Sequence, residues 1–199
     1  MSRVLAVDTS TDMTTLALVD SGQVIGSADH TDARGHAEAI GMLFASIPEL
    51  DVTTPGFTTP DLVVCGVGPG PFTGLRVGIA FGETLGWAWG IPVVGVCSLD
   101  AVAHHIVRTS APGTEFIAAT DARRGEYYWA RYDSAGQRLE GPQVSKREVV
   151  DSGGTVVFSG VHPLAVDLAA CLDTSAHLPL TPLYLRAPDA QPSTPAGAP

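Results

Sequence analysis

Positive charge is scarce in this sequence, which has 11 Lys and Arg residues against 21 Asp and Glu and a formal net charge of −10. Proteins that bind nucleic acids by themselves neutralise phosphates with a surplus of Lys and Arg. The bulk composition therefore argues against direct binding of a nucleic acid, and a partner would have to hold such a substrate. A local basic patch remains compatible with this average.

Cysteines and uninterrupted apolar runs are also few. Cys65, Cys97 and Cys171 are an odd number and lack zinc or redox spacing. Two of them end the apolar runs LVVC and VVGVC, which predicts buried thiols in a reducing cytoplasm. The N-terminal apolar run is too short for a signal peptide, and the apolar segment 77–99 is interrupted by Glu83. We therefore expect a cytoplasmic protein that does not contact a membrane.

Apolar periodicity predicts alternating strands and helices. The order is β-β-β-α-β-α-β-α over an N-terminal lobe at residues 1–108. The turn APGT marks a boundary to a smaller α/β lobe at 109–186, which contains a hairpin around DARRG. The tail at 187–199 is rich in Pro and Ala and is expected to be disordered.

A regular series of glycines follows the predicted fourth strand. Gly74, Gly78, Gly82 and Gly86 occupy every fourth position of a predicted helix at 74–89. Each interior glycine costs a helix about 1 kcal/mol relative to alanine. Residues four apart share one helix face, so the glycines form a flat strip that admits another backbone closely. The strip faces either the protein's own sheet or neighbouring helix, or a helix of a partner.

Phosphate-binding motifs are incomplete. The segment GVGPGPFTGLR has neither the Walker spacing with its lysine nor the dinucleotide pattern, and its two prolines remove N–H donors. The end of the first strand is similar to the phosphate loops of sugar kinases and actin-like ATPases. The candidate nucleotide-binding residues are Asp8, Thr9, Ser10, Gly68 and Gly70. The alternative is a capped polar turn and a tight strand-to-helix turn.

Catalytic and metal-binding patterns are missing. A helical metal motif needs histidines at i and i+4, but His36 is followed by Ile40, and His104 and His105 are adjacent. No G-x-S-x-G elbow is present. We predict neither a metal site nor a catalytic residue. The charged and aromatic segment DARRGEYY forms either a recognition surface or a solvated turn with a salt bridge.

Four segments together resemble one protein family. VLAVDTST, GPGPFTGLRVGIAFGETLGWAWGIPVVGVCSLDAVA, DARRGEYY and TPLYLRAPDA are similar to the TsaB (YeaZ) family, subunits of the bacterial tRNA threonylcarbamoyladenosine machinery. The resemblance implies an α/β, actin-like ASKHA (ribonuclease H-like) fold of two lobes, with a mixed sheet flanked by helices.

The resemblance also implies a function without catalysis. Such a subunit dimerises with and activates a TsaD-type paralogue, with a TsaE-type ATPase, for threonylcarbamoylation of the N6 of the tRNA adenosine adjacent to the anticodon. In that family TsaD carries the metal on an H-x-x-x-H helix, which His36 and Ile40 do not reproduce. A homodimer is expected when the partner is absent, and tRNA is contacted only indirectly. No cofactor is required, and ATP or ADP at the complex interface is a candidate ligand.

The family pairs through its first two helices, here at 36–48 and 74–89. Glu83 departs from the basic or neutral residue expected there, which predicts altered pairing. The alternatives are a free-standing ATPase or kinase of the same fold, with SGVH at 159–162 as its second phosphate loop, and a peptidase. The predicted interface residues are His36, Ile40, Leu43, Phe44, Ile47, Leu75, Gly78, Ile79, Gly82, Leu85 and Gly86.

Overall fold

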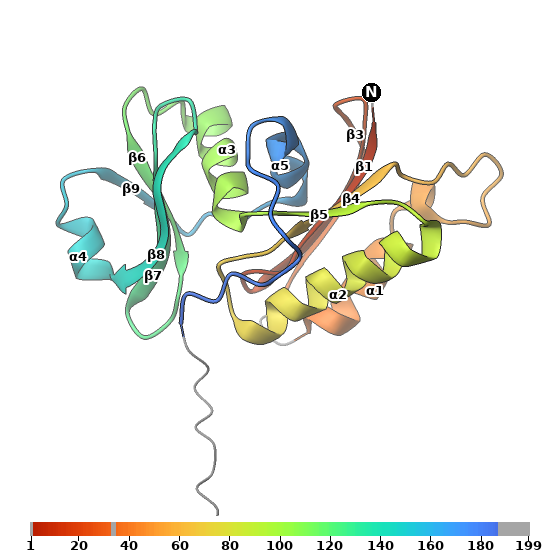
Figure 1. The fold of residues 1–199 in the computed structure, drawn as a ribbon, viewed down its shortest axis with the longest axis horizontal. Coiled ribbons are helices and arrows are strands. Elements are labelled where there is room, and N and C mark those ends of the chain that lie inside the picture. The colour runs from red at the N-terminus through yellow and green to blue at the C-terminus, as the bar shows by residue number, and fades with distance from the viewer. Residues whose placement is uncertain (1, 33–34, 187–199) are drawn as a thin grey trace, which may run out of the picture.

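Continuous apolar runs form the central strands of a first sheet. The computed structural model describes residues 2–32 and 35–186, and its strand order here is β3-β2-β1-β4-β5 (Figure 1). The first three strands are antiparallel, whereas β1, β4 and β5 run parallel to one another. The strands are β1 (Arg3–Asp8), β2 (Met13–Asp20), β3 (Gln23–Thr31), β4 (Leu62–Gly66) and β5 (Val93–Val96).

Helices cover both faces of this sheet. On one face, α1 (His36–Ala45) and α2 (Phe72–Trp89) pack over β1, β2 and β4, and the short 3-10 helix Pro48–Leu50 follows α1. On the other face, α5 (Ala165–Ala170) packs over β1 and β2 and is followed by the 3-10 helix Cys171–Asp173. The central strands are apolar throughout because both of their faces are covered.

A second, smaller sheet repeats the connectivity of the first. Its order is β8-β7-β6-β9, again three antiparallel strands followed by a parallel fourth. The predicted two-lobed, actin-like α/β fold is thereby confirmed. The strand β8 was not predicted. The elements are β6 (Phe116–Asp121), β7 (Glu126–Tyr132), β8 (Arg138–Lys146), α4 (Arg147–Asp151) and β9 (Val156–Ser159).

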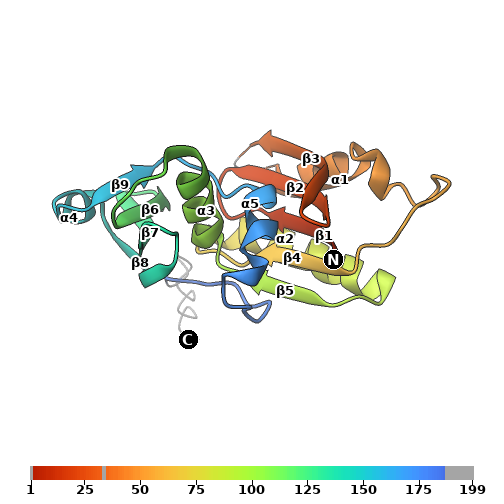
Figure 2. The ribbon, with the colours of Figure 1, turned by 90° about the horizontal axis from the view of Figure 1, so that it is seen from above.

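Two helices join the lobes. Although α3 (Ser98–Ser110) follows the first sheet in sequence, it packs against β6 and β7, while α5 follows the second sheet and packs on the first. Figure 2 shows α3 and α5 side by side between the two sheets. The lobe boundary near residue 108 stays a prediction, and the tail predicted to be disordered lies outside the described residues.

The segment after α5 returns along the first lobe. Leu178 pairs with Gly95 of β5, and the Leu183 N–H donates to the Val67 carbonyl at 2.8 Å. The Arg186 guanidinium donates to the carbonyl of Ala122, in the turn after β6. This segment therefore links the edge of the first sheet to the second lobe.

All three cysteines are free and buried, which confirms the prediction of buried thiols for Cys65 and Cys97. Burial raises the pKa of each thiol to about 12. Within residues 2–32 and 35–186, no helix is long and apolar enough to cross a membrane.

Candidate functional site

The glycine face of α2 is turned toward the protein's own sheet. A Cβ added to Gly78 would overlap Thr9 Oγ1, one added to Gly82 would overlap Cys65 Sγ, and one added to Gly86 would overlap a Val93 methyl. The glycines therefore let α2 lie closer to the sheet than a helix with side chains could. The strip is therefore covered within the subunit, which is one of the two alternatives that the spacing left open, and contact of Gly78, Gly82 and Gly86 with a partner stays a prediction.

Most of the predicted apolar interface residues are also core residues. On α1 and after it, His36, Ile40, Leu43 and Ile47 are buried, and on α2 so are Leu75 and Ile79. They pack on the first sheet, which leaves little of their surface for a partner, and their contact with a partner stays a prediction. Phe44 and Leu85 are half-buried, and the Phe44 ring meets that of Phe81 edge-on with centroids 5.7 Å apart.

The opposite face of the same two helices is exposed and largely uncharged. On α1 it carries Met42, which is 61% exposed, and on α2 it carries Trp87, which is 86% exposed. Small residues surround them and leave the helix backbones accessible. The exposed face, as we call it, comprises Ala37, Gly41, Met42, Ala45, Ala80, Thr84 and Trp87.

The side chain of His36 is buried and contacts residues of its own subunit. Its Nδ1 lies 2.7 Å from Thr14 Oγ1, and the position one turn later is the buried Ile40. Burial lowers the pKa of His36, although Asp32 and Asp12 act in the opposite direction. The described part of the chain contains no cluster of three or more His, Cys, Asp or Glu side chains that could hold a metal.

The loop after β1, the candidate nucleotide site, forms hydrogen bonds within the protein itself. Asp8 Oδ1 accepts hydrogen bonds from Ser10 N and Oγ, each at 2.7 Å, and Oδ2 accepts one from Ser98 Oγ at 2.6 Å. Burial raises the pKa of Asp8 to about 6 despite the hydrogen bonds from Ser98 and Ser10, which lower it. Ser98 is the first residue of α3, and Cys97 precedes it as the N-cap without a side-chain hydrogen bond.

Thr9 and the glycines of the next loop hold α2 in place. Thr9 Oγ1 donates to the Gly74 carbonyl at 2.7 Å and accepts from Gly78 N at 3.1 Å. A Cβ on Gly70 would overlap the Ser10 carbonyl, and Gly68 N donates to Ser98 Oγ at 3.1 Å. These contacts support the structural alternative for the five residues. Their binding of a nucleotide stays untested.

A cleft lies between the lobes, beside this loop. It has a volume of about 510 Å³, and its walls come from both lobes, including Thr11 and Asp12 of the first and the segment Ser159–His162 of the second. His162 Nδ1 lies 3.1 Å from Thr11 Oγ1 and 3.4 Å from Asp12 Oδ1. The candidate second phosphate loop therefore does face the first, and its histidine bridges the gap.

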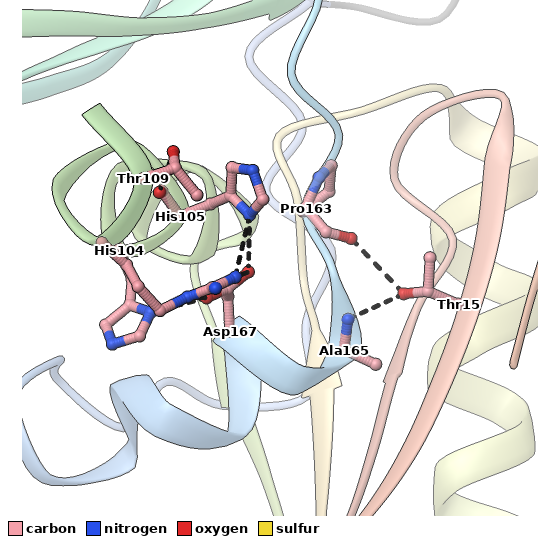
Figure 3. A network of polar contacts seen from close by, with 8 residues as sticks. Thr15, His104, His105, Thr109, Pro163, Ala165 and Asp167 are labelled. Atoms are coloured by element: carbon pink, nitrogen blue, oxygen red, sulfur yellow. Dashed lines mark hydrogen bonds and ion pairs between the residues drawn. The ribbon is translucent and has the colours of Figure 1, made fainter. Parts of the chain in front are cut away.

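A buried carboxylate joins α3 to α5 (Figure 3). Asp167 accepts from His104 Nδ1 at 2.7 Å, from His105 Nδ1 at 2.9 Å and from Arg108 Nε at 3.2 Å. Burial by itself would raise the pKa of Asp167, but the hydrogen bonds from His104, Arg108 and His105 outweigh it and hold the pKa at about 2. Figure 3 also shows Thr15 accepting from Ala165 N at 2.9 Å, which fixes the start of α5 on β2.

Sequence reasoning missed the exposed face and the Asp167 network. Trp87 and Met42 belong to the helices that we singled out, and their exposure follows once the glycine strip is placed toward the sheet. A signal for them was available, because Trp87 lies on the side of α2 away from Gly78 and Gly82. The Asp167 network had no such signal, since its two helices are about 60 residues apart in the sequence.

Comparison with known proteins identifies the family. Residues 28–173 match the family model described as TsaD: tRNA N6-adenosine threonylcarbamoyltransferase. An uncharacterised protein of Mycobacterium tuberculosis (strain H37Rv) is 38% identical, with 96% of this chain and 95% of that protein covered. The tRNA threonylcarbamoyladenosine biosynthesis protein TsaB of Escherichia coli K12 is 36% identical, over 65% of this chain but only 54% of that protein.

A solved structure gives the same result. A Pseudomonas aeruginosa protein described as similar to the peptidase YeaZ superposes with a TM-score of 0.76 at 25% identity, covering 94% of this chain and 100% of that one. The chain therefore belongs to the family that the matching model describes, as one of its TsaB (YeaZ) members.

Proposed function

We propose that this protein is a non-catalytic subunit in tRNA threonylcarbamoyladenosine biosynthesis and that it binds a TsaD-type transferase. The exposed face of α1 and α2 is the observation that carries this proposal. A Trp that is 86% exposed is unusual on a protein surface, because an aromatic side chain of this size normally buries most of its area. Trp is also enriched among the residues that contribute most to protein–protein binding.

The shape of this face suits a helix of the partner. Ala37, Gly41 and Ala45 succeed one another every fourth residue along α1, and Ala80 and Thr84 do the same on α2. Small residues at that spacing allow two helix backbones to approach closely, and Met42 and Trp87 flank them with apolar area. Glu83 is exposed on the same helix, and we expect it to favour a basic residue on the partner.

The interior of the first lobe supports a non-catalytic role for this subunit. His36 is bonded to Thr14 and has Ile40 where a second metal ligand would stand. Asp8, at the end of β1, accepts three hydrogen bonds from its own chain. We propose that the transferase carries the metal, that ATP or ADP binds at the interface of the complex, and that a TsaE-type ATPase joins this complex. A homodimer through the exposed face is the expected state of the isolated chain.

A free-standing ATPase or kinase remains the alternative. The cleft between the lobes favours it, because loops of both lobes face each other there. The contacts of His162 with Thr11 and Asp12 count against it, since they engage polar groups of the two loops that would have to hold the phosphates of a nucleotide.

Light scattering after size-exclusion chromatography, with the protein alone and mixed with its cognate transferase, tests the proposal. We expect a one-to-one complex for the wild type. Trp87→Ala should weaken the complex at least tenfold, the loss expected for a central aromatic residue. Gly41→Leu should also prevent assembly, because its side chain would project from the exposed face.

The matched control is Leu139→Ala, which removes an exposed apolar side chain (47% exposed) from the second lobe and should leave the complex intact. Wild-type affinity in both Trp87→Ala and Gly41→Leu would refute the proposed interface. A wild-type chain that forms no complex would refute the partnership.

A further inference from the structure

A cluster of basic side chains surrounds the β6–β7 turn of this acidic protein. Each member contacts the turn or belongs to it: Lys146 Nζ donates to the Arg124 carbonyl, Arg147 N to the Gly125 carbonyl, and Arg186 Nη1 to the Ala122 carbonyl. With Arg123 and Arg124 there are five cations, against the carboxylates of Asp121 and Glu126. Lys146 and Arg186 pair with Glu126, and Arg147 pairs with Asp121. With Asp12, which lines the same cleft, the local formal charge is +2 in a chain whose net charge is −10.

The turn presents two of these arginines in a backbone conformation that glycine would adopt more easily. The φ angles of Arg123, Arg124 and Gly125 are 62°, 54° and 71°. The left-handed region costs a residue with a side chain about 1 kcal/mol. Arginine at both positions is therefore unfavourable for folding. Departures from local preference of this kind are expected at functional sites.

The turn forms one wall of a continuous groove. The cleft of about 510 Å³ and a neighbouring cavity of about 210 Å³ share Pro71, Asp121 and Arg123. Thr11 and His162 line the larger part, and Phe72, Tyr184 and Arg186 line the smaller. In Figure 1 the C-terminal segment descends beside this turn, in agreement with the bond from Arg186 to Ala122.

Two residues that line the larger cavity each have a buried polar atom without a hydrogen-bond partner among the described residues. The atoms are Thr120 Oγ1, of a residue only 5% exposed, and Arg147 Nε. Buried polar groups in proteins are nearly always hydrogen-bonded. Arg147 Nε can only donate, and its guanidinium already donates through Nη2 to Asp121. The Thr120 hydroxyl can donate or accept, so acceptor oxygens such as those of a phosphate would satisfy both atoms.

Planar side chains accompany the cations. Tyr184 is 36% exposed and stacks on Phe72 with ring centroids 3.9 Å apart, while the Arg147 guanidinium lies 4.9 Å from the centre of the Tyr127 ring. RNA bases that are not paired stack on tyrosine rings and on guanidinium planes, and the neighbouring phosphates are held by Arg and Lys. The acidic remainder of the surface repels RNA, which confines contact to this groove.

We propose that this groove binds a single-stranded segment of RNA, with Arg123 and Arg124 on its phosphates. This rests on the proposed function, in which the RNA is the tRNA modified by the complex. The protein then contacts the substrate directly, contrary to our expectation from the net charge of an indirect role. The strongest reason for this proposal is that residues of the basic turn, and two residues with buried polar atoms that lack a hydrogen-bond partner, line the same groove.

Fluorescence anisotropy with an unmodified tRNA transcript, titrated at several salt concentrations, tests this inference. The variant is Arg123→Gly with Arg124→Gly, which removes two charges and relieves the positive φ angles, so thermal unfolding should show no loss of stability. We expect the affinity of the complex for tRNA to fall at least tenfold and the slope of log affinity against log salt to become shallower by about two.

The single substitutions Arg123→Gly and Arg131→Gln form a matched pair. Arg131 is bound to Glu115 and Glu140 at the other end of β7, so its removal changes net charge equally and should leave tRNA binding unchanged. Equal tRNA affinity and salt slope in the wild type and the double variant would overturn the inference. So would displacement of the tRNA by excess AMP, which would assign the groove to free nucleotides.

The proposed function is tested separately, since partner binding is read by light scattering and the titration is run on the chain both alone and in its complex. A double variant that still binds the transferase but has lost tRNA supports the RNA groove. If the wild type fails to bind the transferase, the tRNA affinities of the wild type and the double variant, each measured without the transferase, still test the inference.

Discussion

Replacing Gly82 with alanine measures how closely α2 approaches the sheet. The new Cβ would overlap Cys65 Sγ and lie 3.3 Å from a methyl carbon of Val63, both side chains fully buried in the first sheet. Alanine gains about 1 kcal/mol of helix propensity over glycine. Forcing an extra methyl group into a packed core costs about 1–3 kcal/mol. At this site we expect the cost at the upper end, and a net loss of about 2 kcal/mol in the free energy of unfolding.

Gly41→Ala is the control, because it makes the same glycine-to-alanine change at a position that does not face the sheet. Gly41 is exposed on α1, and apart from its chain neighbours and the backbone of its own helix no described atom lies within 4 Å of an added Cβ. Gly41→Ala should therefore show only the helix propensity and stabilise the protein by about 1 kcal/mol. The two variants differ in the sign of their effect, although the chemical change is identical.

Urea unfolding followed by circular dichroism gives both free energies, and the m-values should stay equal to that of the wild type. The double variant Cys65→Ala/Gly82→Ala should lose at least 0.5 kcal/mol less than the sum of its single variants, since removing Sγ makes room for the new methyl. If Gly82→Ala stabilised the protein as much as Gly41→Ala, the strip would not be pressed on the sheet. Our account of the glycines would then be refuted.

Two buried carboxylates predict opposite dependences of stability on pH. The pKa of Asp8 is raised from 3.8 to about 6, so the folded protein keeps a proton that the unfolded chain loses, and stability falls as pH rises from about 4 to 6. Asp8→Asn should remove this fall and add about 3 kcal/mol at pH 7. A series of urea titrations over pH 3–8 measures it, and a variant that retains the wild-type slope would contradict the shift. In the folded protein the pKa of Asp167 is lowered to about 2. The ionised carboxylate therefore contributes about 2 kcal/mol to the free energy of unfolding above pH 4, and this contribution is lost as pH falls from about 4 to 2. Asp167→Asn should be less stable than the wild type at pH 7 by that amount, and the two acid-unfolding curves should converge near pH 2; parallel curves would rule out a role for the ionised carboxylate.

The pattern of apolar residues predicted correctly those strands that are covered on both faces of the sheet. RVLAVD and LVVCG are continuous apolar runs, and they became the central parallel strands β1 and β4. The β8 strand was missed because RLEGPQVSK contains Gly, Pro and charged residues. It lies at an edge of the second sheet, where a proline is tolerated because one row of backbone groups remains unpaired.

The glycine strip shows why the site was harder to predict than the fold. Spacing of four identifies a flat helix face, but close packing on a sheet of the same chain and close packing on a partner require the same residues. Only the position of Thr9, Cys65 and Val93 decides between them, and these side chains come from three different strands or loops. The function of the basic turn was also ambiguous. The segment DARRG does not reveal that its two arginines have positive φ angles or that the turn borders a groove.

The placement of α2 connects the two proposed surfaces. Its first residue, Phe72, forms part of the groove, and Trp87 belongs to its exposed face. At 1.5 Å per residue, the 15 steps between them span about 22 Å. Because the glycine face presses the helix onto the sheet, this distance is fixed in the folded subunit. A transferase bound on the exposed face would thus hold its active site at a set distance from an RNA strand in the groove, which gives a subunit without catalytic residues a physical means of positioning the substrate.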